Sequence, residues 1–209
     1  MDLSVIIPCH QLEDYIQPLL ESLKVQKTKY QVEYVFVFDS CTDRTQELVE
    51  AANLPNYSCI VCNVHSAGHA RNMGIEQAQG KYIWFVDGDD WLLGENAYDL
   101  VLDAMYQTND HRLLLNFKSN SFNMDSDVMV WRHIYLRDFL YGIWFYRLPY
   151  NDDVVFMNAV KAKEQMLYPE FQLKMLNPPV YYYNYMRPGS IIYNVSNGIT
   201  QWEGDIGLE

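Results

Sequence analysis

Residues 80–90 read GKYIWFVDGDD and decide the fold of this chain. The apolar run 82–86 is typical of a strand buried on both faces, and the acidic turn 87–90 stops it, with a glycine that permits a tight bend. Two carboxylates one residue apart, Asp87 and Asp89, can converge on one cation, and their oxygens suit Mg²⁺ or Mn²⁺. Alone, the same four residues are equally typical of an acidic surface turn.

The sequence before this stretch alternates strand and helix patterns. Apolar runs at 3–7, 34–38 and 57–64 predict three further buried strands, and amphipathic patterns at 15–23, 43–49, 67–78 and 98–105 predict helices. Repeated strand–helix–strand units indicate an α/β fold with a mostly parallel sheet covered by helices on both faces. Ligands of such sheets bind beyond the carboxyl ends of the strands, where Asp39 and Asp87 both lie.

The second half of the chain is less regular. We expect strands at 128–131 and 180–185 and helices at 137–144 and 154–166. The whole chain has 209 residues, which suits a single domain.

Composition excludes several classes of protein. The formal net charge of −12 argues against binding to nucleic acid or to an anionic membrane surface, and an anionic ligand would need a local cation. No apolar run reaches the length of a membrane-spanning helix, and the first residues lack the basic start of a secretory signal. The four cysteines indicate a reducing cytoplasm, and we interpret Cys59 and Cys62 as part of a plain buried strand.

Four motifs occur in order along the first half: VIIP at 5–8, DSCTD at 39–43, GHARNMG at 68–74 and the stretch 80–90. Together they resemble the family 2 glycosyltransferases of the GT-A fold, over residues 3–93. The resemblance implies a Rossmann-like nucleotide-binding, mostly parallel mixed sheet between helices, with a reduced C-terminal acceptor lobe. It further implies a single domain with a nucleotide-sugar-binding half, 1–94, and an acceptor-side half, 95–209.

The resemblance also implies roles for individual residues. Asp89 would be the direct metal ligand, Asp87 would lie near the ribose and the metal, and the ion would be Mn²⁺ or Mg²⁺. Asp39 would accept a hydrogen bond from the uracil ring. The remaining residues expected around the nucleotide sugar are Pro8, Cys9, His10, Gly68 and Arg71. Asp43 we interpret as a helix cap rather than a ligand.

A catalytic base is expected at residues 150–156, YNDDVVF, which resemble the family's Glu-Asp pair before a helix. Asp153 would take the acceptor proton, with Asp152 as the alternative. The competing interpretation is that both carboxylates only stabilise the start of the helix. Near the end of the chain, Arg187 could approach a phosphate or simply lie on the surface.

The activity that the resemblance implies is inverting transfer of a sugar from a nucleoside diphosphate, such as UDP, to a hydroxyl of a saccharide or lipid-linked saccharide in cell-surface polysaccharide synthesis. It implies a cytoplasmic protein, at most peripheral at the membrane, and leaves a homodimer or a partner glycosyltransferase open.

Ser40 and Cys41 depart from the family's Gly and Ser, and the span between Asp90 and Asp153 is short. A degenerate transferase that only binds a nucleotide or partner is therefore the alternative; nucleotidyl transfer is disfavoured because residues 9–12 are not a Gly-rich, basic loop.

Overall fold

The computed structural model describes residues 1–121, 127–148 and 151–198, so the end of the predicted acceptor-side half lies outside the described residues. Its strands form one sheet: β1 Leu3–Cys9, β2 Val32–Asp39, β3 Tyr57–Cys62, β4 Tyr82–Phe85, β5 Trp91–Leu92, β6 Arg112–Ser119, β7 His133–Leu136 and β8 Met175–Tyr183. Its helices are α1 Gln17–Lys24, α2 Thr45–Ala52, α3 Ala67–Gln77, α4 Ala97–Thr108, α5 Asp152–Leu167 and α6 Ile191–Ser196, with 3₁₀ turns η1 Val130–Arg132 and η2 Arg137–Leu140.

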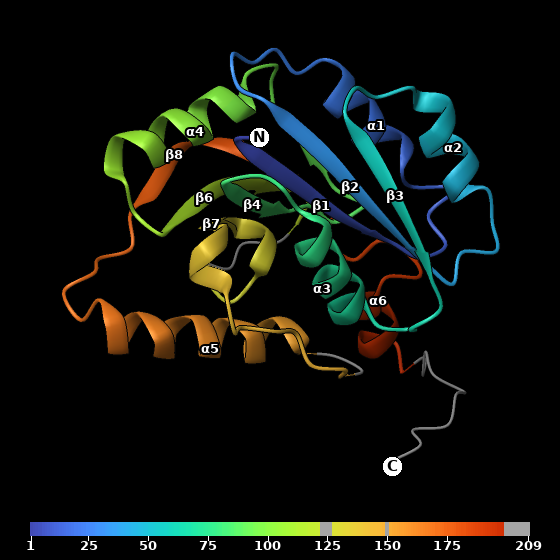
Figure 1. Cartoon of the computed structure of the whole chain (residues 1–209). Helices are drawn as coiled ribbons and strands as arrows, with labels where there is room; N and C mark the ends of the chain where they lie inside the picture. Colours follow the sequence, from blue (N-terminus) through green and yellow to red (C-terminus); the bar gives the residue numbers. More distant parts are fainter. Residues whose placement is uncertain (122–126, 149–150, 199–209) are drawn as a thin grey trace.

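The strand order in the sheet is β3-β2-β1-β4-β7-β6-β8-β5 (Figure 1). The first four strands of this order run parallel to one another. β7 runs antiparallel to β4 and to β6, whereas β8 runs parallel to β6. The predicted α/β class with a mixed, largely parallel sheet between helices is confirmed.

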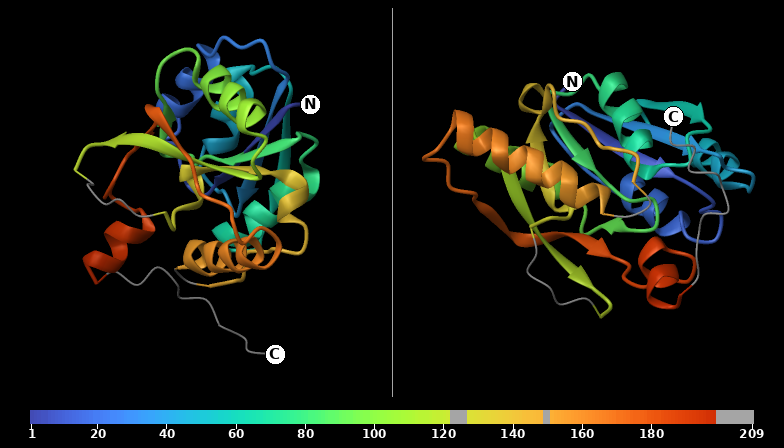
Figure 2. Two further views of the ribbon diagram at one scale, coloured as in Figure 1. Left: turned by 90° about the vertical axis from the view of Figure 1, so that its left-hand side faces the viewer. Right: turned by 90° about the horizontal axis from the view of Figure 1, so that it is seen from below.

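Two apolar layers cover the sheet, because successive side chains of a strand point to opposite faces. On β1, Val5 and Ile7 join the core beneath α1 and α4, whereas Ile6 joins the core beneath α3 and α5. Figures 1 and 2 show the same division, with α3 and α5 together on one side of the sheet. α3 packs especially closely, since a β-carbon on Gly74 would lie only 2.3 Å from Cγ2 of Ile6.

The first half matches the predicted strands and helices closely. Pro18 lies in the first turn of α1, as expected. Asp43 precedes α2 but is not its N-cap, which is Arg44; the Asp43 carboxylate instead accepts the N–H groups of Thr45 and Glu13.

The interpretation of the Cys59–Cys62 segment as a buried strand is half right. It forms β3, but β3 is an edge strand with Cys59 exposed and Cys62 half-buried. Residues three apart on a strand point to opposite faces, so this pair is not arranged to share a metal or a disulfide. Both thiols are free.

The second half differs more from the prediction. The strand expected at 128–131 is wrong, because a 3₁₀ turn occupies Val130–Arg132 and the strand begins at His133. The helix expected at 137–144 is only the short 3₁₀ turn η2. β6 was not expected, and α5 and β8 overlap the predicted helix and strand. The two halves share one sheet, and their division at residue 94 stays a prediction.

Candidate active site

The carboxyl ends of three neighbouring strands meet at one edge of the sheet. β2, β1 and β4 are adjacent and parallel, so Asp39 at the end of β2, Cys9 at the end of β1 and Asp87 just beyond β4 lie along this edge. Pro8 is part of β1, and His10 follows it with its Nδ1 2.7 Å from the carbonyl oxygen of Asp39. The fold therefore brings these predicted site residues to the edge where ligands of such sheets bind.

Asp39 is buried, and its carboxylate organises the loop that enters α3. Oδ1 accepts hydrogen bonds from the backbone N–H groups of Val64 (2.8 Å) and His65 (2.9 Å), and Oδ2 accepts one from that of Ser66 (2.7 Å). Ser66 in turn caps α3 by accepting the N–H of His69. These bonds engage both carboxylate oxygens of Asp39, and its predicted contact with a uracil ring stays a prediction.

Arg71, in the first half of α3, is the centre of the site. Its side chain is 7% exposed, and Nη2 lies 2.8 Å from Oδ1 of Asp87. Nη1 lies 3.3 Å from Oδ2 of Asp152 and 3.3 Å from Oδ1 of Asp153. Burial opposes the charged form, but the charges of the three carboxylates outweigh it and raise the pKa of Arg71 above its ordinary value. The arginine therefore stays cationic and connects α3 with the turn that follows β4 and with the start of α5.

The surroundings of Asp153 alter its acidity strongly. Burial disfavours its ionised form, Arg71 partly offsets this, and Asp152 and Asp87 add repulsion, so that its pKa is raised to about 7. Its Oδ2 also accepts a hydrogen bond from the N–H of Val130 at 3.3 Å. A carboxylate with a pKa near neutrality can take up a proton at working pH, as a general base must.

The competing interpretation, that Asp152 and Asp153 only stabilise the start of α5, accounts for part of what is seen. Both lie in the first turn of α5, where negative charge is favourable. No side-chain capping bond forms at its N-cap, Asn151, and both carboxylates contact Arg71 instead. The pair thus faces the other site residues.

The three aspartates of the turn after β4 have three different partners. Asp87 pairs with Arg71, and Asp89 pairs through Oδ2 with Nε of Arg187, which follows β8. Asp90 is buried; its Oδ2 accepts the hydroxyl of Tyr181 at 2.6 Å and its Oδ1 accepts the N–H of Asn184 at 2.8 Å. Asp90 therefore anchors β8 to the turn, a role that the sequence analysis did not assign.

Asp87 and Asp89 are the residues predicted to hold a divalent ion. Within the described ranges, no three side chains among His, Cys, Asp and Glu gather as a metal-binding group. The donor set nevertheless fits an ion of the Mg²⁺ type, which proteins hold through one or two carboxylates while phosphate oxygens complete the shell. Arg71 and Arg187 are the cations that these two carboxylates contact in the structure.

Gly68 explains how α3 approaches the connection that leads to α5. A β-carbon on Gly68 would lie 2.9 Å from Cβ of Phe145 and 3.0 Å from Oδ2 of Asp152. A larger residue would therefore push the connection and Asp152 away from Arg71. In this structure the predicted role of Gly68 is that of close packing beside the site; its contact with the nucleotide stays a prediction.

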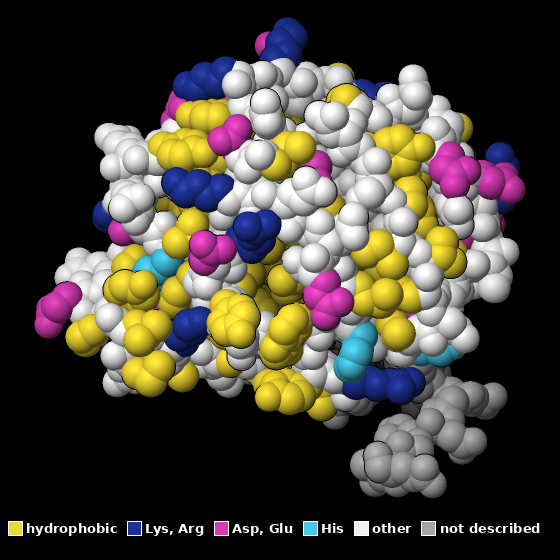
Figure 3. Space-filling view, in the orientation of Figure 1, with side chains coloured by type: hydrophobic (Ala, Val, Ile, Leu, Met, Phe, Trp, Pro, Cys, Tyr) yellow, Lys and Arg dark blue, Asp and Glu magenta, His cyan; other side chains and the backbone are white. Residues whose placement is uncertain are grey.

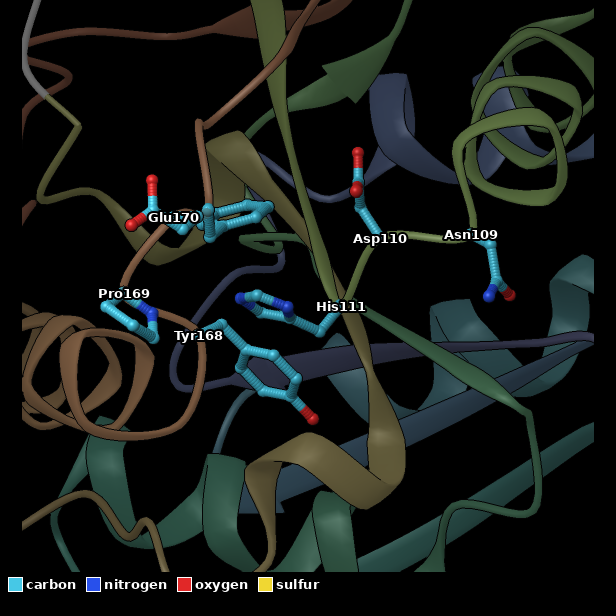
Figure 4. A pocket seen from close by; sticks show the side chains of 7 residues that line it. Asn109, Asp110, His111, Tyr168, Pro169 and Glu170 are labelled. Carbon is cyan, nitrogen blue, oxygen red and sulfur yellow. The ribbon is translucent and has the colours of Figure 1, made fainter.

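A separate pocket of about 330 Å³ lies at the far end of α5 (Figure 4). It is lined by Asn109, Asp110, His111, Tyr168, Pro169, Glu170 and Phe171. His111 stacks on Tyr168 and contacts Oε1 of Glu164 at 3.0 Å, so its ring is part of the packing. Glu164 is roughly 18 Å along the helix from Asp152, at about 1.5 Å per residue. The pocket is thus remote from the carboxylates around Arg71.

Known proteins resemble this chain in sequence and in fold. The family model described as Glycosyl transferase family 2 matches residues 4–165. The poly(ribitol-phosphate) beta-N-acetylglucosaminyltransferase TarS of Staphylococcus aureus is 39% identical over 106 residues, which are 47% of this chain and 18% of that protein. The glycosyltransferase GlyA of Streptococcus pneumoniae is 28% identical over 171 residues, 78% of this chain and 22% of that protein.

Solved structures show the same fold. The crystal structure of S. aureus TarS 1–349 in complex with UDP-GlcNAc has a TM-score of 0.81 at 24% identity and covers 92% of this chain and 61% of that one. A mannosyltransferase from Pyrobaculum calidifontis, solved with GDP-Man and Mn²⁺, has a TM-score of 0.66 at 16% identity and covers 93% of this chain and 60% of that one. The chain thus spans less than two thirds of these proteins. Among the described helices, none is long and apolar enough to cross a membrane.

Proposed function

Because the chain belongs to glycosyl transferase family 2, we propose that it transfers a sugar from a nucleoside diphosphate, a UDP-sugar, to an acceptor hydroxyl with inversion at the anomeric carbon. One observation carries the proposal: three carboxylates from two distant segments, Asp87, Asp152 and Asp153, converge on one buried arginine at the carboxyl edge of the sheet. A TarS structure solved with UDP-GlcNAc supports the choice of UDP.

Asp153 is the proposed base. The acceptor oxygen attacks the anomeric carbon, the bond from that carbon to the diphosphate breaks, and the acceptor proton passes to the Asp153 carboxylate. The raised pKa of about 7 suits this step, since about half of the Asp153 carboxyl groups are ionised at neutral pH and the ionised form is basic enough to accept a proton. Arg71 orients Asp153 and Asp152 by its contacts with both.

Asp89, assisted by Asp87, is the proposed holder of Mn²⁺ or Mg²⁺. Such an ion, when bound, neutralises negative charge on the leaving diphosphate. An acidic chain with a net charge of −12 needs a local cation to accept an anionic donor. For the nucleoside we propose the edge formed by Pro8, Cys9, His10 and Asp39, with Gly68 and Arg71 beside it.

For the acceptor we propose a saccharide or polyol-phosphate chain of a cell-surface polymer. The similarity to a poly(ribitol-phosphate) transferase supports this class.

Calorimetric titration with UDP, with and without Mn²⁺, tests the donor site. We expect Asp89→Ala to weaken the Mn²⁺-dependent affinity for UDP at least about tenfold, because it removes the proposed metal ligand. Asp138→Ala, which removes an exposed carboxylate on η2, serves as the matched control and should bind as the wild type does. Unchanged affinity in Asp89→Ala would contradict the metal assignment, and a wild-type chain that does not bind UDP would contradict the proposed donor.

A further inference from the structure

Three aromatic side chains are exposed in the described part of the connection between η2 and α5: Tyr141 directly after η2, and Trp144 and Tyr146 nearer to α5. Burial alternates along residues 143–146: Ile143 and Phe145 are buried, whereas Trp144 is 43% and Tyr146 is 62% exposed. The core-facing side chains of this segment are thus those of Ile143 and Phe145, and those of Trp144 and Tyr146 are turned outward. In Figure 3 hydrophobic side chains gather over the lower part of the molecule, where this connection crosses in front of α5.

The connection is held in place by its backbone. The side chain of Asn72 on α3 accepts the N–H of Phe145 at 2.9 Å and donates to its carbonyl oxygen at 2.8 Å. The Phe145 ring stacks on Phe156 of α5, with ring centroids 3.9 Å apart and an interplanar angle of 7°. Because these contacts fix Phe145 on both sides, the backbone of its two outward neighbours is held in place.

The same segment borders the carboxylates of the site. A β-carbon on Gly68 would lie 3.0 Å from Oδ2 of Asp152 and 3.2 Å from the carbonyl oxygen of Tyr146, so both residues border Gly68. The guanidinium carbon of Arg71 lies 5.5 Å from the centre of the Phe145 ring. The backbone that carries the two outward aromatic residues therefore passes beside the group of charges that contains the proposed base.

We propose that Trp144 and Tyr146 form an acceptor platform, on which a pyranose ring of the acceptor saccharide stacks while its hydroxyl reaches Asp153. This inference rests on the proposed function and adds the residues that recognise the acceptor. Flat aromatic faces pack well on the C–H surfaces of sugars, and a Tyr hydroxyl can also hydrogen-bond. Rigid aromatic side chains lose little conformational entropy on binding, which favours recognition of a polar ligand.

A membrane surface is the other ligand that exposed Trp and Tyr can serve, since both residues favour the membrane–water interface. Binding to an anionic surface requires clustered basic residues, and this chain carries 27 acidic against 15 basic side chains. The charge therefore favours the saccharide.

The test follows the indole N–H signal of Trp144 by NMR while the UDP-bound chain is titrated with cellobiose, lactose and N,N′-diacetylchitobiose. We expect at least one disaccharide to shift this signal at millimolar concentration. Its affinity, which for all variants is taken from backbone amide signals because Trp144→Ala lacks the indole, should fall about tenfold in Trp144→Ala and in Tyr146→Ala. Tyr57→Ala, which removes an exposed aromatic residue from β3, is the matched control and should bind as the wild type does.

Three outcomes would overturn the platform: no disaccharide binds, binding leaves the Trp144 signal unmoved, or both alanine variants bind with wild-type affinity. Sedimentation with phosphatidylglycerol vesicles that is lost in Trp144→Ala would assign the two rings to a membrane and would also overturn it. UDP affinity, measured on the same samples, reports on the donor site alone. Failure of UDP to bind would count against the proposed function rather than against the platform.

Discussion

Arg112 and Arg71 are both buried among ionisable groups, but the charges around Arg112 are balanced and those around Arg71 are not. Arg112, at the start of β6, meets one carboxylate: Nε and Nη2 lie 2.7 and 2.6 Å from the two oxygens of Glu164. Its Nη1 donates to Nδ1 of His133 at 3.2 Å. Arg71 instead meets three carboxylates, and its Nε has no hydrogen-bond partner in the part of the chain that the structure describes.

The ionisable groups around the two arginines also differ in the direction of their pKa shifts. Burial raises the pKa of Glu164, but hydrogen bonds from His111 and Arg112 outweigh it and hold that pKa below its ordinary value. Burial and the charge of Arg112 lower the pKa of His133 to about 3, so this histidine is neutral. At the other end of α5, the pKa of Asp153 is raised to about 7.

The balanced charges at Arg112 suit a structural role, whereas the excess of carboxylates at Arg71 suits a chemical one. In the Arg112–Glu164 pair one positive charge meets one negative charge, and the pair holds β6 against α5. An excess of carboxylates around one arginine keeps one of them close to protonation, which is costly for folding and useful for proton transfer.

Asp153→Asn should show the largest effect on activity. Removing the base is expected to lower the rate of transfer about 10²- to 10⁴-fold, because general-base catalysis contributes that much. Stability at pH 8 should stay unchanged or rise by about 1 kcal/mol, since an uncharged amide avoids the unfavourable ionised form. Single-turnover kinetics and urea unfolding on the same samples measure the two quantities, and full transfer by the variant would place the base elsewhere.

Glu164→Ala should show the largest effect on stability. It leaves Arg112 buried without its carboxylate, and breaking such a pair costs about 3–5 kcal/mol. Glu170→Ala, an exposed carboxylate at the neighbouring pocket, is the control and should change stability by less than about 0.5 kcal/mol. Urea unfolding measures both. If Glu164→Ala lowers the free energy of unfolding by less than about 1 kcal/mol, the contact between Arg112 and Glu164 is not a structural ion pair.

The pH dependence should be the smallest of the three effects. Below pH 7, kcat/KM for transfer should rise about tenfold per pH unit as Asp153 ionises, and then level off. Stability should respond in the opposite sense: the folded-state pKa lies above the ordinary value of 3.8, so the folded chain binds the extra proton between these values. The contribution of Asp153 to stability is therefore fully present below about pH 4 and is lost as the pH rises through 7.

That pH profile can be compared directly with the Asn variant. Subtracting the unfolding free energies of Asp153→Asn from those of the wild type isolates the titration of this one group. A difference that does not change between pH 4 and pH 8 would contradict the raised pKa.

The sequence alone predicts the first half well because its strands are continuous apolar runs that stop at Asp39 and Asp87. The second half was predicted less well for a physical reason. β7 begins at His133, which is fully buried and follows the buried Arg132. Polar residues at the start of a run normally mark a surface, and only a distant partner such as Arg112 makes their burial favourable.

In the site, too, the sequence alone does not show which residues distant along the chain come into contact. The carboxylates could be located from their motifs, since Asp87 and Asp89 follow a strand and Asp152 and Asp153 begin a helix. Their partners could not, because Tyr181 reaches Asp90 and Arg187 reaches Asp89 from the far end of the chain. Contacts of this kind depend on the order of strands in the sheet, which no local pattern records.

The two hydrogen bonds between the Asn72 side chain and the Phe145 backbone have a consequence for substitutions in the neighbouring segment. Asn72 recognises the main chain of Phe145, in the way that a neighbouring strand would, and not the identity of the residues on either side. These two hydrogen bonds therefore do not depend on which side chains occupy positions 144 and 146. Under the proposed platform, exchanging Trp144 and Tyr146 would change the saccharide that is bound while the Asn72 bonds and Asp153 stay in place.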